Sequence, residues 1–218
     1  MKRIFLAILV LLVSAAVMRA DSVVTTEPTG TDWVYWSQLG PTFTTIANPF
    51  SFTTTDGVGG TGGYASGTGE VMQQDISWGG NFFPNDYINW TPGSGALTLV
   101  FDSGFTQIGA QIMSEYSGAF TAQICDNNDA QCFTENGTSN GDNDGSAIYI
   151  GIANATPITS VTFSLTSAYD GTTNDFALDT VVLGGGSPVV PEPNSFLLLG
   201  TGIAGLAGLI RRKFAKAL

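Results

Sequence analysis

Histidine is absent from this 218-residue chain, and no lysine or arginine occurs between residues 20 and 210. Without an imidazole, the chain cannot form a Ser-His-Asp or Cys-His catalytic site, nor most kinds of zinc site. Without basic side chains, the interior of the sequence offers no footprint for nucleic acid, no Schiff-base lysine and no arginine clamp for phosphate. We therefore expect no nucleic-acid partner.

The first twenty residues have the parts of a secretory signal peptide. Lys2 and Arg3 precede the apolar stretch 4–13, small residues follow, and Ala20 stands at a plausible cleavage position. An uncleaved anchor is the alternative, but the apolar run is short for a membrane span. The sequence predicts a signal peptide at residues 1–20 and an exported body after it.

The other end combines a flexible break, an apolar run and basic residues. Residues 184–190 form a linker rich in glycine and proline, and the apolar run 196–210 predicts a helix. At a helical rise this run reaches only about 22 Å, against roughly 30 Å of hydrocarbon, so it is a short transmembrane helix. Arg211, Arg212 and Lys213 follow it and predict a cytoplasmic C-terminal side.

The order of these parts resembles a known sorting signal. Pro191, Glu192 and Pro193 precede the apolar helix and its basic flank, and residues 191–218 as a whole are similar to a PEP-CTERM sorting signal. The resemblance implies a bacterial protein whose partner is an exosortase, a membrane protease or transpeptidase that processes the tail near the Pro-Glu-Pro motif. Tails of this family are also given the name "ice-binding protein, C-terminal", which implies nothing about the body.

The body, residues 21–183, reads as strands separated by turns. Residues 96–101 and 158–166 alternate apolar and polar side chains, and the runs 107–113, 119–124, 147–153 and 176–183 have the same character. Glycine and asparagine punctuate the rest, and no amphipathic helical stripe stands out. The sequence predicts an all-β fold, a single antiparallel β-sandwich of jelly-roll-like form.

Cys125 and Cys132 are the only cysteines, and both lie in the part of the chain that would be exported. An oxidising compartment favours a disulfide between them. Free thiols are the alternative. A redox-active pair usually has a closer spacing, so we expect a bridge that pins a hairpin or loop.

An acidic stretch follows the cysteines. Residues 140–145 fit the opening of a calcium-binding loop, with Asn140, Asp142 and Asp144 as the candidate ligands. The pattern then fails, because Gly151 stands where such a loop needs a bidentate glutamate. Solvated turns are the other interpretation of such residues. Calcium is the only cofactor that the sequence suggests.

All four tryptophans lie in the N-terminal half of the body, and a tryptophan ring can stack on the face of a sugar. The candidates are Trp33, Trp36, Trp78 and Trp90. The alternative is that they fill the core. Strand alternation places Trp33 and Tyr35 on one face and Trp36 on the other, so not all of them can be core residues.

Taken together, these features predict a non-enzymatic protein of the cell surface or extracellular matrix. The C-terminal helix would anchor it until an exosortase processes the tail, and extracellular polysaccharide is a candidate partner. A lectin-like domain and a calcium-stabilised adhesive domain are the alternatives. A glycoside hydrolase needs two facing carboxylates, but a body without basic side chains is poorly equipped to position a substrate.

Overall fold

The computed structural model describes residues 22–27, 31–128 and 130–184. The predicted signal peptide, most of the linker and the sorting signal with its apolar helix lie outside these ranges. Within them, one short 3₁₀ helix, η1 (Trp36–Leu39), accompanies the strands. No helix among these residues is long and apolar enough to cross a membrane.

Thirteen strands make up the described body. They are β1 (Ser22–Val24), β2 (Asp32–Val34), β3 (Thr44–Ile46), β4 (Phe50–Thr53), β5 (Gly59–Tyr64), β6 (Gly69–Gln73), β7 (Tyr87–Trp90), β8 (Leu97–Ser114), β9 (Gly118–Asp126), β10 (Gln131–Ser139), β11 (Ile148–Ala168), β12 (Phe176–Leu178) and β13 (Val181–Gly184). All ladders between these strands are antiparallel, which confirms the predicted all-β antiparallel fold.

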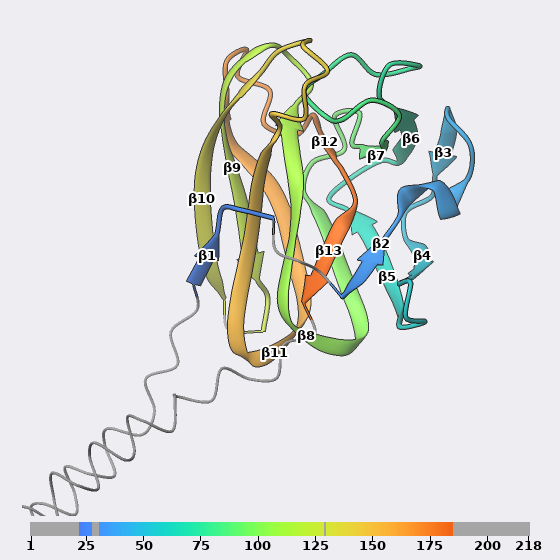
Figure 1. Cartoon of the computed structure of the whole chain (residues 1–218), viewed down its shortest axis with the longest axis vertical. Helices are drawn as coiled ribbons and strands as arrows, with labels where there is room; N and C mark the ends of the chain where they lie inside the picture. Colours follow the sequence, from blue (N-terminus) through green and yellow to red (C-terminus); the bar gives the residue numbers. More distant parts are fainter. Residues whose placement is uncertain (1–21, 28–30, 129, 185–218) are drawn as a thin grey trace, which may run out of the picture. The chain divides into compact units, whose positions relative to one another are not determined.

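Two long strands, β8 and β11, turn the sheet into two layers (Figure 1). Their pairing shifts register between Ala153 and Ile158 of β11, where both strands bend. Before the bend, β8 pairs with β5; after it, β8 pairs with β12 and β13. The late part of β11 pairs with β9, which pairs with β10. One layer therefore runs β4-β5-β8-β11-β9-β10, and the other contains β1, β12, β13, β2, β7, β6 and β3. This is a β-sandwich that shares its two central strands.

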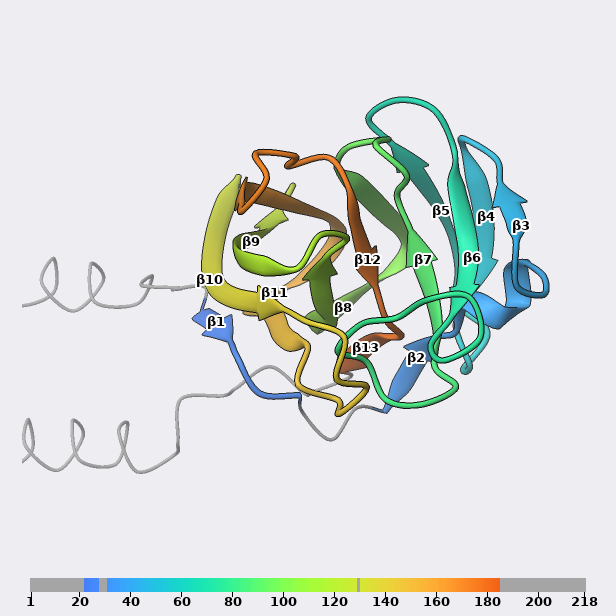
Figure 2. The same ribbon diagram turned by 90° about the horizontal axis from the view of Figure 1, so that it is seen from above.

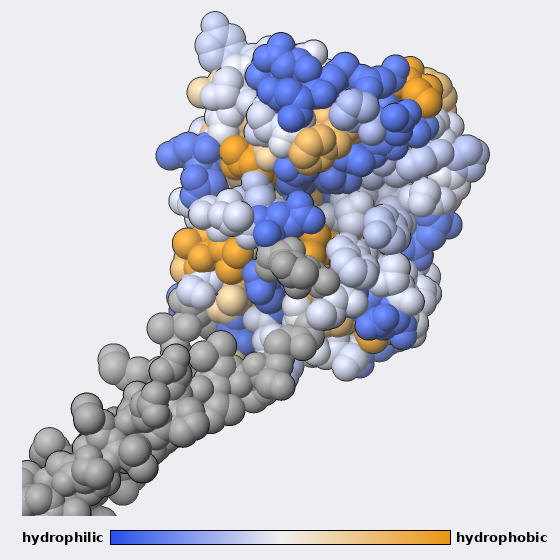
Figure 3. Space-filling view, viewed as in Figure 1, coloured by the Kyte–Doolittle hydropathy of each residue, from blue (hydrophilic) through white to orange (hydrophobic). Residues whose placement is uncertain are grey.

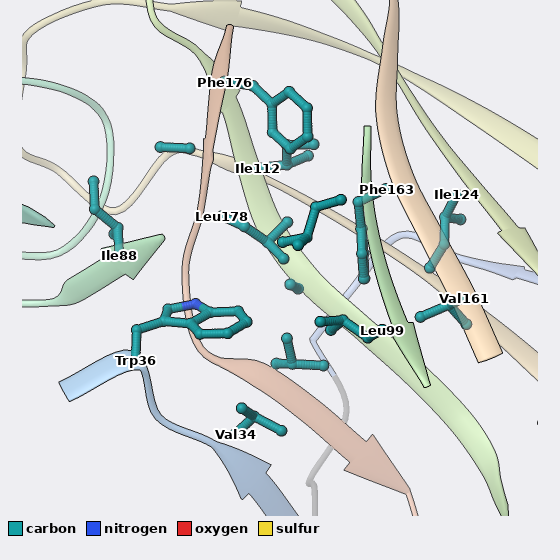
Figure 4. Close-up of a cluster of buried hydrophobic side chains, with 14 of the residues drawn as sticks. Val34, Trp36, Ile88, Leu99, Ile112, Ile124, Val161, Phe163, Phe176 and Leu178 are labelled. Atoms are coloured by element: carbon teal, nitrogen blue, oxygen red, sulfur yellow. The ribbon is translucent and has the colours of Figure 1, made fainter. Parts of the chain in front are cut away.

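Apolar side chains from both layers meet in one core (Figure 4). Leu99 of β8, and Val161 and Phe163 of β11, are fully buried, as their alternation predicts. Thr98 and Thr162 alternate with them, and their hydroxyl groups share a hydrogen bond of 2.9 Å on the other face of the layer. Figure 4 shows the Trp36 ring lying among apolar side chains from other strands.

The two ends of the sandwich differ. The loops 91–96, 115–117 and 169–175 gather at one end, where Gly95 and Glu115 donate backbone hydrogen bonds to the segment 174–175. Figure 2 views this end from above, with β3 to β6 on one side and β9 to β11 on the other. The last described residue, Gly184, pairs with Gln107 beside the bend of β8, at the opposite end. We call the first end the loop end.

Candidate functional site

The sorting residues fall outside the described part of the chain. Pro191, Glu192 and Pro193, and the basic residues Arg211, Arg212 and Lys213, all come after Gly184, the last residue that the structure describes. Their roles therefore rest on the sequence and on the family comparison.

The predicted disulfide is confirmed. Cys125 of β9 and Cys132 of β10 stand directly opposite each other in the ladder, and their sulfur atoms are bonded at 2.07 Å. The bridge joins β10 to its only ladder partner among the described strands. Its role is structural, because it fastens a strand at the edge of the layer.

Two of the four tryptophans belong to the core. Trp36 is fully buried, and its indole Nε1 donates to the backbone oxygen of Asp179 at 2.8 Å. Trp78 is also buried, and its Nε1 contacts the sulfur of Met113. For these two residues, the structure matches the alternative interpretation, in which the rings fill the core.

The other two tryptophans are half-buried and do not form a common platform. Trp90 lies against Trp78, with ring centroids 5.8 Å apart, and its Nε1 donates to Asp175 Oδ1 at 2.7 Å. Trp33 lies on β2, a different part of the second layer. Sugar stacking by Trp33 and Trp90 stays a prediction from the sequence.

The acidic loop is held by hydrogen bonds that use its candidate ligand atoms. Asn140 Oδ1 accepts from the backbone N–H of Asp142 at 2.8 Å, and Asp144 Oδ1 accepts from that of Ser146 at 3.0 Å. These are the Asx turns that such residues form readily. The bonds to Ser146 lower the pKa of Asp144. No group of three or more His, Cys, Asp or Glu side chains in the described ranges is placed to hold a metal ion.

Two carboxyl groups interact where the chain enters β7 and β13. Asp179 is buried, and this burial together with the nearby charge of Asp86 raises its pKa to about 7. Burial also raises the pKa of Asp86. Two like charges this close cannot both ionise easily, so the pair holds a proton at mildly acidic pH.

A second pair of acids lies at the loop end. Desolvation and the neighbouring charge of Asp175 raise the pKa of Glu115 to about 7. The backbone N–H of Glu115 also donates to the backbone oxygen of Asp175 at 3.3 Å, which ties two loops together. Trp90, the last residue of β7, donates a hydrogen bond to the carboxylate of Asp175. This bond connects the end of β7 to the same two loops.

Sequence reasoning missed two exposed tyrosines at this end. Tyr169 is 80% exposed and Tyr116 is 49% exposed. Tyr169 lies against Gly118, whose φ of 135° is in the region that favours glycine. A Cβ at position 118 would stand only 2.5 Å from Tyr169 Cβ, so glycine lets the tyrosine lie against this turn. The sequence does not single out these tyrosines as binding residues, because a single tyrosine in a turn is common.

A cleft of about 570 Å³ opens over the adjacent strands β9, β10 and β11. Thr121, Asn136, Thr138 and Ser167 contribute to its polar wall, and its apolar lining includes Phe120. Neither this cleft nor a smaller hollow of about 340 Å³ over β5 and β8 is lined by Asp or Glu. The volume of the larger one is in the range of small-molecule sites. We call it the corner cleft.

Comparison with protein families identifies the tail. Residues 189–213 match the family model of the PEP-CTERM protein-sorting motif, so the resemblance drawn from the sequence is confirmed. No curated protein matches the chain.

Comparison with solved structures gives only distant similarities. CsCBM6-3 from Clostridium stercorarium, in complex with cellobiose, is 11% identical with a TM-score of 0.25, over 76% of this chain and 94% of that one. A variant of the family 29 carbohydrate-binding module CBM29-2 is 11% identical with a TM-score of 0.24, over 80% of this chain and 98% of that one. At such values, neither similarity carries an argument about function.

Proposed function

We propose that this chain, which carries a PEP-CTERM sorting motif, is an exported, non-enzymatic protein of the cell surface or extracellular matrix. The motif at residues 189–213 is the observation that carries the proposal. The body would cross the membrane with its signal peptide, stay held by the apolar helix 196–210, and then be processed by an exosortase-type enzyme near the Pro-Glu-Pro motif.

The charge distribution supports this sequence of events. All seven basic residues lie outside positions 20–210, while the 18 acidic residues lie between Asp21 and Glu192. Removal of both ends would leave no basic residue, and would leave 18 acidic residues, or 17 if Glu192 is removed too. Such a body is strongly solvated and self-repelling, which suits a hydrated layer outside the cell.

Carbohydrate binding is a second candidate function for the body. The corner cleft favours it, because its wall contains hydroxyl and amide groups. The interacting acids Asp86 and Asp179 lie outside the linings of both hollows, so they give no support to a glycoside hydrolase. The jelly-roll form of the sandwich stays a prediction.

Calcium binding by Asn140, Asp142 and Asp144 also stays a prediction. A calcium-stabilised adhesive domain would melt at a higher temperature with calcium than with a chelator. An unchanged melting temperature would count against that alternative.

The sorting proposal is tested by changing the motif in a bacterial host that contains an exosortase. Pro191, Glu192 and Pro193 are replaced together by alanine, and Pro188→Ala, outside the matched residues, serves as the control. We expect the triple variant to stay in the membrane fraction while the control leaves it as the unaltered protein does. Release of the triple variant at the normal rate would overturn the proposal.

A further inference from the structure

The corner cleft is built on a row of polar side chains that crosses three strands. Ser167 of β11 donates to Thr121 Oγ1 of β9 at 2.9 Å, and Thr121 donates to Asn136 Oδ1 of β10 at 2.9 Å. The ladders place these residues side by side, with Ser167 and Asn136 each paired to Thr121. The row is therefore fixed before any ligand arrives, which lowers the entropic cost of binding.

Tyr169 supplies an aromatic ring near the loop end of this row. Thr138 pairs with Ala119, which lines the cleft and follows Gly118. Tyr169 does not itself line the cleft, but it lies against Gly118, next to the lining residue Ala119, and most of its surface is exposed. An exposed aromatic ring beside a polar wall is suited to a ligand that has both an apolar face and hydroxyl groups.

The charges in and near the cleft indicate which class of ligand it can bind. None of the residues that line it is charged, and no basic residue occurs between positions 20 and 210. Asp170 follows Tyr169, and hydrogen bonds from Thr172 lower the pKa of its carboxyl group. An anionic ligand would meet repulsion from this carboxylate without a compensating cation. A neutral, hydroxyl-rich ligand would meet no such electrostatic repulsion.

We propose that the corner cleft binds a neutral saccharide, with one sugar ring stacked on Tyr169 and hydroxyl groups bonded to Asn136 and Thr138. The amide nitrogen of Asn136 has no hydrogen-bond partner among the described residues, so it is available as a donor. This inference rests on the proposed carbohydrate-binding function and names its site and its ligand class. It does not depend on the sorting motif.

The location of the cleft fits a surface protein. Its lining residues Ala119 and Thr138 lie at the loop end of β9 and β10, whereas Gly184, the last described residue, lies at the opposite end of the body. The face of the body in Figure 3 is mainly hydrophilic, with apolar residues in separate small patches. On this face, the apolar residues do not form one broad patch.

Calorimetric titration of the full chain with defined oligosaccharides, in a detergent that contains no sugar, tests the proposal. The neutral probes are cellohexaose, mannohexaose and laminarihexaose, and an alginate hexasaccharide is the acidic probe. The variants are Tyr169→Ala and Asn136→Ala. Tyr35→Ala is the matched control, because Tyr35 is an exposed tyrosine outside the cleft. Far-UV circular dichroism checks that each variant is folded.

We expect at least one neutral probe to bind, and the alginate probe to bind more weakly or not at all. Tyr169→Ala and Asn136→Ala should each weaken binding by about tenfold or more, while Tyr35→Ala should leave it unchanged. Absence of binding by all three neutral probes at about 10 mM, equal binding by folded Tyr169→Ala, or a preference for alginate would each overturn the inference. None of these results would affect the sorting proposal, which the membrane-release experiment tests separately.

Discussion

At the residue scale, the buried carboxyl of Asp179 makes the stability of the fold depend on pH. Burial and the charge of Asp86 raise the pKa of Asp179 from 3.8 to about 7. Between these values the folded protein holds a proton that the unfolded chain has released, so the free energy of unfolding decreases as the pH increases. Glu115, with a pKa raised to about 7, acts in the same direction. The melting temperature should be higher at pH 5 than at pH 8.

Asp179→Asn should reduce this pH dependence, because asparagine does not titrate. The equivalent change Asp142→Asn, in an exposed turn, is the control and should leave the pH dependence unaltered. Melting curves from pH 5 to pH 8 provide the measurement. An identical slope in the wild-type protein and Asp179→Asn would show that this carboxyl does not carry the effect.

The segment around Trp36 shows how far strand alternation predicts burial. The order Trp33, Val34, Tyr35, Trp36 places alternate residues on opposite faces, and the structure buries Val34 and Trp36 while Tyr35 is exposed. Alternation alone does not say which face is the core. That choice depends on contacts with distant strands, such as the hydrogen bond from Trp36 to Asp179.

At the element scale, the hairpin of β4 and β5 explains a glycine-rich stretch. Phe50 pairs with Gly62 and Phe52 pairs with Gly60, and each phenylalanine ring covers the glycine opposite it. So many glycines in a short segment are typical of a turn. Here they are strand residues that leave room for rings from the adjacent strand.

Gly62→Ala should therefore destabilise the protein by about 1–3 kcal/mol, because its Cβ would overlap the ring of Phe50. Gly79→Ala is the matched control, since a Cβ at that position meets no atom within 4 Å. Urea unfolding of both variants measures the difference. Equal stability of the two would contradict the packing described for this hairpin.

The disulfide is the second feature that acts on a whole element. Replacing Cys125 and Cys132 by serine should lower the free energy of unfolding by about 2.5 kcal/mol, the chain-entropy value for so short a loop. Denaturant unfolding of the double variant and of the wild-type protein measures the loss. A reductant should lower the free energy of unfolding of the wild-type protein and leave that of the variant unchanged. If the reductant does not change the stability of the wild-type protein, the bridge is not stabilising.

The bends of β8 and β11 were harder to predict than the strands themselves. Residues 96–101 and 107–113 read as separate runs, because the segment between them contains polar residues and a glycine. In the structure the same strand continues through this segment and changes layer. Periodicity identifies the apolar faces, but long-range pairing decides whether two runs form one strand.

At the scale of the whole molecule, the two ends of the chain could be predicted better than the function of the body. Targeting segments depend on local order and charge, so the sorting tail is recognisable from the residues alone. The corner cleft is not, because it joins residues from β9, β10 and β11 that only the fold brings together.

Intact mass spectrometry of the protein from its final location tests the sorting proposal most directly. If the tail is processed as proposed, the mature chain begins near Asp21 and ends near the Pro-Glu-Pro motif, without the apolar helix or the basic residues after it. A chain that still extends beyond Arg211 in that location would contradict the proposal.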